Sequence, residues 1–292
     1  MLHTNKKQLP SIAIQGSISH PMVAPVMEFS SDADGFGHSV MNMGGIVYNV
    51  NIGDLCMGMY GDHVEPCVST KNLRNEMENN AYQMFSCIGN TATVVTGPAA
   101  GHKGYVVGKH GRSHVMIQFN NDTTQLLSYN DQIMVKTRGV GLKLLDYPQI
   151  VVACMDPELL EKLGVEEKDG KLVVPVAKRI PSKLMGSGVG IDPPYLSDYD
   201  LMTSDKETIR KYGLEDLRLG DIVLIEDADN TVGRGYLKGA VTIGVVIHGD
   251  SFIMGHGPGI TTLLSCKQSV IEGRIDPKAN LVNYLDLRGT GV

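Results

Sequence analysis

The sequence has 292 residues, of which 42% are apolar and 20% are charged. This length exceeds the size at which one hydrophobic core usually stops growing, so we expect two or three domains, and no apolar stretch approaches the ~20 residues that cross a membrane. The net charge of −6 excludes a general attraction to nucleic-acid phosphates and leaves only a local role of that kind.

The N-terminal segment and the cysteines both indicate a cytoplasmic protein. Lys6 and Lys7 are not followed by an apolar run of signal-peptide length. The cysteines are widely spaced and form no Cys-x-x-Cys pair; they are Cys56, Cys67, Cys87, Cys154 and Cys266. An odd number at irregular spacing argues against a disulfide framework or a zinc ribbon and is typical of buried free thiols in a reducing compartment.

The first polar motif lies on a glycine-rich loop that begins at Asp32. The carboxylates of Asp32 and Asp34, together with Gly37, match the opening of an EF-hand calcium loop. Phe36, however, stands where that loop needs an oxygen ligand. We therefore expect a solvated turn that also carries His38, and not a calcium site.

The segment from Gly61 to Cys67 is the strongest candidate for chemistry in the N-terminal half. In an extended backbone, His63, Glu65 and Cys67 project to one side. A histidine and a carboxylate two residues apart can share a metal ion or a proton, and Pro66 restricts the segment to a strand end or an edge. A plain hydrogen-bonded pair is the alternative interpretation.

A helix and a small barrel are predicted next. The helix lies between Asn72, which can cap its first turn, and Gly89, which suits a left-handed stop. Five short strand candidates follow, separated by glycine, proline, asparagine and aspartate turns, at residues 91–96, 104–109, 113–119, 124–129 and 132–136. So many short strands in one stretch indicate a small barrel at residues 91–137.

The turn from Thr96 to Val107 resembles the glycine-and-lysine turn of KOW-type SH3-like barrels in ribosomal and transcription proteins. This resemblance implies an SH3-like barrel over residues 91–137. Lys103, Lys109 and Arg112 raise the hypothesis that this barrel binds RNA. A polar barrel face packed against another subunit is the favoured alternative.

Beyond residue 138 the pattern is mixed, with strands the strongest feature. Capping residues predict short helices at 156–164 and 204–213, and Asp169-Gly170 predicts a hairpin turn. Apolar and β-branched runs predict core strands at residues 172–176, 222–225 and 240–247. The expected fold is mainly β and multidomain, with an N-terminal β portion at 1–137 and a C-terminal β-rich domain with short helices at 138–292.

Two glycine-rich loops are candidates for binding a cofactor or an anion. The first holds Gly186, Gly188 and Gly190, but prolines and not a helix follow it, and no Lys-Ser or Lys-Thr pair completes a phosphate loop. A tight turn or a backbone nest for an anion remains. Gly257, in the second loop, joins these candidates.

The second glycine-rich loop lies close to His248, Asp250 and His256. If Gly249 and Asp250 formed a two-residue hairpin turn, His248 and His256 would lie about 17 Å apart on a strand and could not bind one metal. They converge only if the loop around Gly257 folds back.

Four strings spread along the chain share a second resemblance. They are Gly61–Pro66, Leu219–Val223, Gly244–Ser251 and Gly255–Gly259. Together they resemble the uncharacterised prokaryotic domain-of-unknown-function family 4438, nearly from end to end. The resemblance implies a mainly β, multidomain protein that divides after the barrel, and it implies no activity.

Three functional hypotheses from different classes remain open. The first is a small-molecule enzyme, a metal-assisted hydrolase or lyase, because histidines and carboxylates concentrate in glycine-rich loops where the backbone can approach a ligand. The second is a non-catalytic oligomeric ligand-binding or structural protein. The third is an RNA-binding module that uses the barrel.

For the enzyme hypothesis, the candidate catalytic residues are His63, Glu65, Asp250 and His256. His63, Glu65 and His256 are the candidate ligands of a divalent metal, with Glu65 as the base. They should meet in a cleft between the N-terminal and C-terminal portions, and a separation of His63 and His256 above about 15 Å would exclude a shared site. We expect a cytoplasmic homo-oligomer that does not bind membranes and for which a small molecule is favoured over nucleic acid as the ligand.

Overall fold

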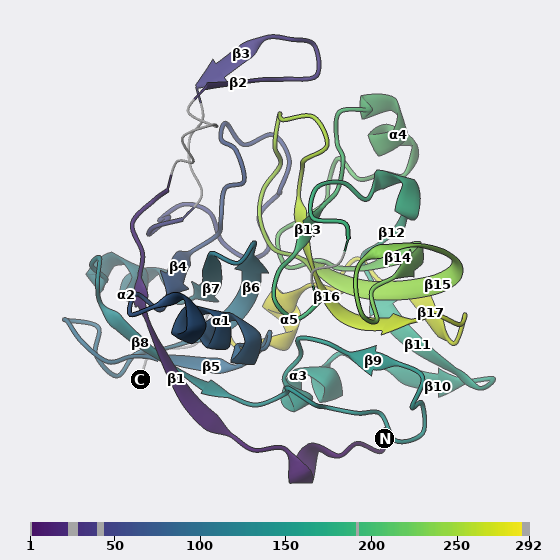
Figure 1. Cartoon of the computed structure of the whole chain (residues 1–292), viewed down its shortest axis with the longest axis horizontal. Coiled ribbons are helices and arrows are strands. Elements are labelled where there is room, and N and C mark those ends of the chain that lie inside the picture. Colours follow the sequence, from purple (N-terminus) through teal and green to yellow (C-terminus); the bar gives the residue numbers. More distant parts are fainter. Residues whose placement is uncertain (1, 23–28, 40–43, 191–192, 288–292) are drawn as a thin grey trace.

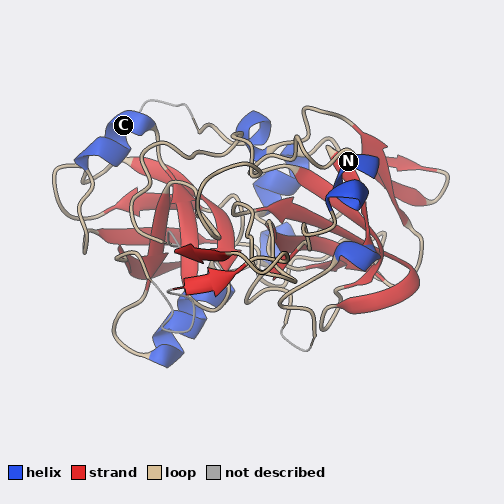
Figure 2. Cartoon of the chain, turned by 90° about the horizontal axis from the view of Figure 1, so that it is seen from above, coloured by secondary structure: helices blue, strands red, loops and turns tan. Residues whose placement is uncertain are grey.

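The structure is a computed structural model that describes residues 2–22, 29–39, 44–190 and 193–287. Its strands fall into two groups, which Figures 1 and 2 show on opposite sides of the molecule. One group is a closed barrel, and the other is a large sheet with a smaller sheet beside it. The fold is mainly β with a few short helices, as predicted.

The barrel closes six antiparallel strands in the order β1-β4-β7-β6-β5-β8. They are β1 (Ile12–Ile18), β4 (Val68–Lys71), β5 (Thr91–Val94), β6 (Lys103–His110), β7 (His114–Gln118) and β8 (Gln132–Thr137). Buried and exposed residues alternate along β8, so Ile133 and Val135 fill the interior. The barrel extends beyond residues 91–137, because β1 and β4 are needed to close it.

Two N-terminal predictions need correction. Residues 124–129 do not form a strand, because Asn120 caps a short helix there, α2 (Asn121–Leu126), and accepts a hydrogen bond from the Thr123 amide at 2.8 Å. The helix predicted from residue 72 is α1 (Glu76–Phe85), which begins later. Its cap is Asn75, whose side chain accepts from the Glu78 amide at 2.9 Å.

The second group is a six-stranded sheet in the order β12-β14-β15-β16-β13, with β9 also paired to β16. Its members are β9 (Val151–Val152), β12 (Lys178–Pro181), β13 (Tyr199–Asp200), β14 (Ile222–Asp229), β15 (Gly235–Val246) and β16 (Gly259–Cys266). A three-stranded sheet pairs β10 (Glu166–Lys168), β11 (Lys171–Val176) and β17 (Ile271–Ile275). The hairpin of β2 (Phe29–Ser31) and β3 (Gly37–Ser39) stands apart at the top of Figure 1.

Local capping and turn chemistry account for the small elements of the C-terminal half. The predicted Asp169-Gly170 turn is confirmed, with positive φ at both residues between paired Lys168 and Lys171. The remaining helices are α3 (Pro157–Lys162), α4 (Lys206–Lys211) and α5 (Leu281–Tyr284), with 3-10 turns at Lys6–Gln8 and Ser182–Leu184. Among the described residues, no helix has the length and apolar character needed to cross a membrane.

The end of β6 packs directly against the C-terminal sheet. Gly108 leaves room for Ile247, since a side-chain carbon at Gly108 would lie within 2.8 Å of it. The Thr261 hydroxyl donates to the Lys109 carbonyl at 3.3 Å. Lys109 itself is fully buried, and its ammonium donates to the Tyr195 carbonyl at 2.7 Å. This packing brings the end of a barrel strand next to β15 and β16, and it removes Lys109 from contact with any RNA.

Candidate metal centre

Polar side chains from both groups of strands meet where the barrel joins the large sheet. The barrel side supplies His63, from the loop before β4, and His110, the last residue of β6. The other side supplies residues on and around β13, β15 and β16, namely Asp198, Asp200, His248 and His256. All are buried except His256, whose side chain is 28% exposed.

Asp200 is the centre of this cluster. His63 Nε2 lies 3.1 Å from Asp200 Oδ2, and His256 Nδ1 lies 2.8 Å from the same oxygen. His248 Nε2 lies 3.5 Å from the other oxygen, Oδ1. His63 Nε2 and His256 Nδ1 are themselves only 3.1 Å apart. Three imidazole nitrogens therefore surround one buried carboxylate, and His63 and His256 lie far inside the 15 Å limit for a shared site.

The histidines of the cluster other than His256, whose Nδ1 faces Asp200, are oriented from behind through Nδ1. His63 Nδ1 faces Asp62 at 2.6 Å, His110 Nδ1 faces Glu65 at 2.7 Å, and His248 Nδ1 faces a backbone carbonyl at 2.9 Å. An acceptor at Nδ1 holds the ring proton there when the imidazole is neutral, which leaves Nε2 as the atom with a free lone pair. This is the arrangement of metal-binding histidines in proteins.

Asp198 and His248 show crowding without hydrogen bonding. Asp198 Oδ2 and His248 Nε2 lie 3.0 Å apart, but neither atom has a hydrogen-bond partner, and both are shielded from solvent. The other Asp198 oxygen accepts from the Gly111 amide at 2.7 Å, which fixes the carboxylate. Two buried polar atoms this close together, with no hydrogen bond between them, indicate that an atom bound by both is missing.

The buried carboxylates of the cluster must be balanced by positive charge. Burial raises the pKa of Asp200, but the adjacent imidazoles of His248, His256 and His63 outweigh it and place that pKa well below its usual range. Burial lowers the pKa of His63, but Asp200 and Asp62 raise it overall to about 9. The raised pKa values of His63 and His248 mean that, without a cation, these two imidazoles hold protons that offset part of the buried negative charge. A divalent ion would supply the same charge.

The backbone around His63 is not the extended segment that the sequence predicts. His63 and Cys67 both have positive φ, 52° and 62°, an uncommon conformation for residues with side chains. The alternation that would place His63 and Glu65 on one side therefore breaks down. As a consequence, His63 faces Asp200, whereas Glu65 faces the barrel.

Glu65 lies behind the cluster and not in it. One oxygen contacts His110 Nδ1 at 2.7 Å and His114 Nδ1 at 3.0 Å, and the other accepts from the Ser69 hydroxyl. The side chain is fully buried, and burial is outweighed by His114 and His110, which hold its pKa far below the usual range. Glu65 is placed to orient His110, and it does not reach the position of a ligand or a base.

Asp250 also lies beside the cluster. Its side chain accepts from the Thr203 hydroxyl at 2.5 Å and lies 3.9 Å from the Lys206 ammonium. Its backbone carbonyl accepts from the His63 amide at 3.1 Å. Asp250 therefore holds the loop of His63 in place through its main chain, and its carboxylate points elsewhere.

The loop after β15 corrects the expected distance between His248 and His256. Gly249 and Asp250 do not form a two-residue hairpin, because β15 ends at Val246, which pairs with Ile260 of β16. The intervening loop folds back over the end of the sheet. His248 and His256 consequently contact the two oxygens of one carboxylate instead of lying about 17 Å apart.

The candidate cofactor-binding glycines allow close packing of loops around the cluster. A side-chain carbon at Gly186 would overlap the Gly255 carbonyl, and one at Gly257 would overlap the Leu201 carbonyl. Gly188 has a φ of +85° and lines the cavity at the cluster, and Gly190 pairs with the backbone of Arg234. Their role in holding a cofactor stays a prediction.

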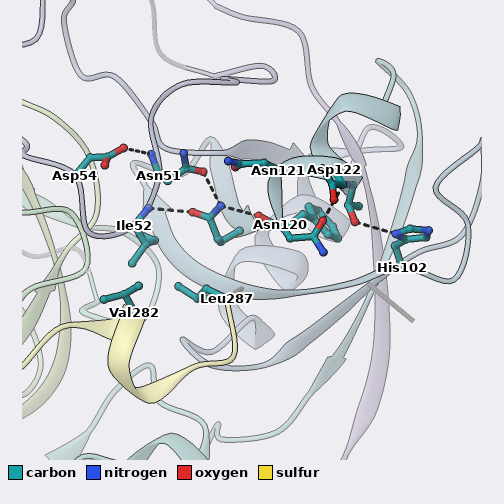
Figure 3. Close-up of a pocket in the computed structure, with 12 residues that line it drawn as sticks. Asn51, Ile52, Asp54, His102, Asn120, Asn121, Asp122, Val282 and Leu287 are labelled. Carbon is teal, nitrogen blue, oxygen red and sulfur yellow. Dashed lines mark hydrogen bonds between the residues drawn. The ribbon is translucent and has the colours of Figure 1, made fainter. Parts of the chain in front are cut away.

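A cavity of about 170 Å³ opens onto the cluster between His63, His110, Ser187 and His256. A larger cavity of about 580 Å³ lies elsewhere, at the barrel end near Asn120 (Figure 3). Asparagine, aspartate and histidine side chains line it, but no group of three metal-binding side chains was found there among the described residues. Of these two cavities, the smaller is therefore the candidate site for metal binding and catalysis.

The structure adds residues to the ligands that the sequence predicts. Three overlapping groups could hold a metal ion, with donor atoms within 4.8 Å of one another: His63, His110 and His248; His63, Asp200 and His256; and Asp198, Asp200 and His248. His110, Asp198, Asp200 and His248 are thus as central as the predicted His63 and His256. Asp198 and Asp200 follow no motif in the sequence, because only the pairing of β13 with β16 brings them here.

Comparison with known proteins agrees with the fold. Residues 29–161 match the model described as "Domain of unknown function (DUF4438), N-terminal", and residues 162–285 match "Domain of unknown function (DUF4438), C-terminal". A solved structure described as "Crystal structure of TM1086" is 42% identical, with a TM-score of 0.91 over 97% of this chain and 99% of that chain. No curated protein matches. The chain therefore belongs to the DUF4438 family.

Proposed function

We propose that this protein is a metal-dependent enzyme that hydrolyses a small molecule at the His63–Asp200–His248 cluster. The observation that carries the proposal is the crowding of three imidazole nitrogens within 3.5 Å of the Asp200 carboxylate. Buried nitrogen and oxygen atoms whose lone pairs face one another at these distances repel, unless protons or a cation lie between them. The free lone pairs at Nε2 favour the cation.

The donors also indicate which metals suit the site. Imidazole nitrogens and carboxylate oxygens are present, and all five cysteines lie outside the groups of donor atoms. This set suits zinc, manganese, iron, cobalt or nickel and does not suit metals that need thiolates. Such an ion lowers the pKa of a bound water and so supplies a nucleophile at neutral pH.

The surrounding residues divide into ligands and residues that position them. The proposed ligands come from the three donor groups, with His63, His248 and Asp200 the most central because each belongs to two of them. Asp62 orients His63 and is itself held by the Ser251 hydroxyl at 2.6 Å. Such carboxylate–histidine pairs make the histidine a stronger ligand and fix its ring.

The cavity limits the substrate to a small group. Its volume of about 170 Å³ lies below the ~300–1,000 Å³ of sites that enclose drug-sized ligands. Only a small molecule, or the reacting end of a longer one, fits beside the cluster. RNA binding by the barrel is less well supported, because Lys109, one of the basic residues that raised this hypothesis, is buried.

Metal content and activity of the purified protein test this function. We expect at least one equivalent of a first-row transition metal by elemental analysis, and hydrolysis of at least one member of a panel of small phosphate esters, carboxylic esters and amides. Both should be lost in Asp200→Asn and retained in the matched variant Asp229→Asn, which lies on β14 away from the cluster. Failure to bind any transition metal after reconstitution would contradict the proposal.

A further inference from the structure

We infer that the cluster holds two divalent metal ions bridged by Asp200, one at each carboxylate oxygen. This inference rests on the proposed function and extends it, since a single ion would satisfy the proposal above. The ions belong to the same first-row transition metals, because the donors at both positions are imidazole nitrogens and carboxylate oxygens.

The first metal position lies between His63, His256 and Asp200 Oδ2. The three donor atoms form a nearly equilateral triangle with sides of 3.1, 3.1 and 2.8 Å. Ligands about 2.1 Å from one ion lie about 3.0 Å apart when they are neighbours in an octahedron. The triangle therefore has the size of one octahedral face, which leaves three further positions for water, substrate or other ligands. His256, the most exposed member, lies on the cavity side.

The second position lies between His248, Asp198 and the other oxygen of Asp200. His248 Nε2 is 3.0 Å from Asp198 Oδ2 and 3.5 Å from Asp200 Oδ1. Asp198 Oδ2 and His248 Nε2 are two of the buried side-chain atoms without a hydrogen-bond partner, and they lie 3.0 Å apart, so they independently indicate a missing cation. The His110 ring lies 4.2 Å from the His248 ring and offers a fourth ligand.

The directions in which the two Asp200 oxygens point distinguish a site for two metal ions from a site for one. Its Oδ2 faces His63 and His256, whereas its Oδ1 faces His248. A carboxylate whose oxygens address separate sets of histidines is placed to bridge, and bridged ions in two-metal enzymes lie about 3.5–4 Å apart. The competing arrangement is a single ion held by His63, His110 and His248.

The buried charge agrees with two ions. Four carboxylates, Asp62, Glu65, Asp198 and Asp200, lie buried in or directly behind the cluster. Their combined charge of −4, one for each ionised carboxylate, equals in size the charge of two divalent ions. Two ions would hold both the attacking and the leaving oxygen of a hydrolysed bond, which suits esters of phosphoric or carboxylic acids.

Manganese titration of the metal-free protein tests this inference. The protein is stripped with a chelator, dialysed and titrated with Mn²⁺, and bound metal is counted by elemental analysis. We expect two ions per chain, and an exchange-coupled electron paramagnetic resonance spectrum that appears only as the second equivalent binds. His256→Gln should reduce the count to one by emptying the first position, and Asp198→Asn should reduce it to one by emptying the second.

The controls separate this inference from the proposed function. His102→Gln, at another partly buried histidine held by one side-chain hydrogen bond, should still bind two ions. Circular dichroism and thermal melting show whether each variant folds. One ion in the wild type, without exchange coupling and retained in His256→Gln, overturns the dinuclear centre but leaves the metal-dependent function intact. Binding of no transition metal overturns both.

Discussion

The candidate metal centre and the larger cavity in Figure 3 are both polar and both contain histidine, but they differ in how their polar atoms are satisfied. In the larger cavity, Gln118 accepts from the Ile52 amide and donates to Asn51 and to the Phe119 carbonyl. In the centre, Asp198 and His248 face each other without a hydrogen bond. Unsatisfied donor atoms, and not the volume of a cavity, therefore indicate where a ligand is missing.

Removing the metal should affect the two regions very differently. A ligand present at 100 times its dissociation constant stabilises the folded state by about 2.7 kcal/mol, which corresponds to about 4 °C in Tm for a chain of this size. We therefore expect chelation to lower Tm by this amount and added metal to restore it.

Differential scanning calorimetry checks this prediction. Asp200→Asn should melt at the same temperature with and without chelator, because it binds little metal to lose. His102→Gln, in the larger cavity, should respond like the wild type. An unchanged Tm after complete metal removal from the wild type would mean that the centre does not depend on a cation for its stability.

A smaller effect, on metal affinity, is expected from replacing Glu65, the carboxylate that orients His110. In Glu65→Gln the shape is kept, but the charge that faces His110 Nδ1 and His114 Nδ1 is lost. Loss of such an orienting partner typically weakens metal binding about 10- to 100-fold. Competition titration with a metal indicator measures this change, with Glu78→Gln on the exposed face of α1 as the control. Equal affinities in both variants would show that His110 is not a ligand.

The sequence predicts some of this centre because part of it is local. His63 and His256 lie in glycine-rich strings, and these can be recognised one at a time. Their meeting cannot be predicted, because it depends on a loop that folds back and on pairing between Tyr199 and Ile260 across the large sheet. The role assigned to Glu65 fails for a local reason, since the positive φ of His63 reverses the expected side-chain alternation.

The same distinction holds for the fold. The turn at Asp169-Gly170 and the helix cap at Asp156 depend on neighbours in sequence, and both are as predicted. The extent of the barrel depends on β1 and β4, which precede the predicted barrel and join it only through long-range pairing with β8 and β7. Local sequence patterns contain no information on strands that pair over such distances. The predicted barrel, which begins at residue 91, is therefore too short.

The last prediction concerns the larger cavity and expects no effect on metal binding. In Gln118→Leu the buried Ile52 amide and Phe119 carbonyl lose their partner, and each such group costs about 1–3 kcal/mol. The free energy of unfolding, measured by urea denaturation, should fall by that order, whereas the exposed control Gln15→Leu should change it by less than about 0.5 kcal/mol. Metal content should stay at the wild-type value in both variants, because the Gln118 hydrogen bonds hold the wall of a cavity in which the polar groups already satisfy one another. A loss of metal in Gln118→Leu, with the fold intact by circular dichroism, would show that the two regions are coupled through the loop from Ile52 to His63, and the contrast between them would not hold.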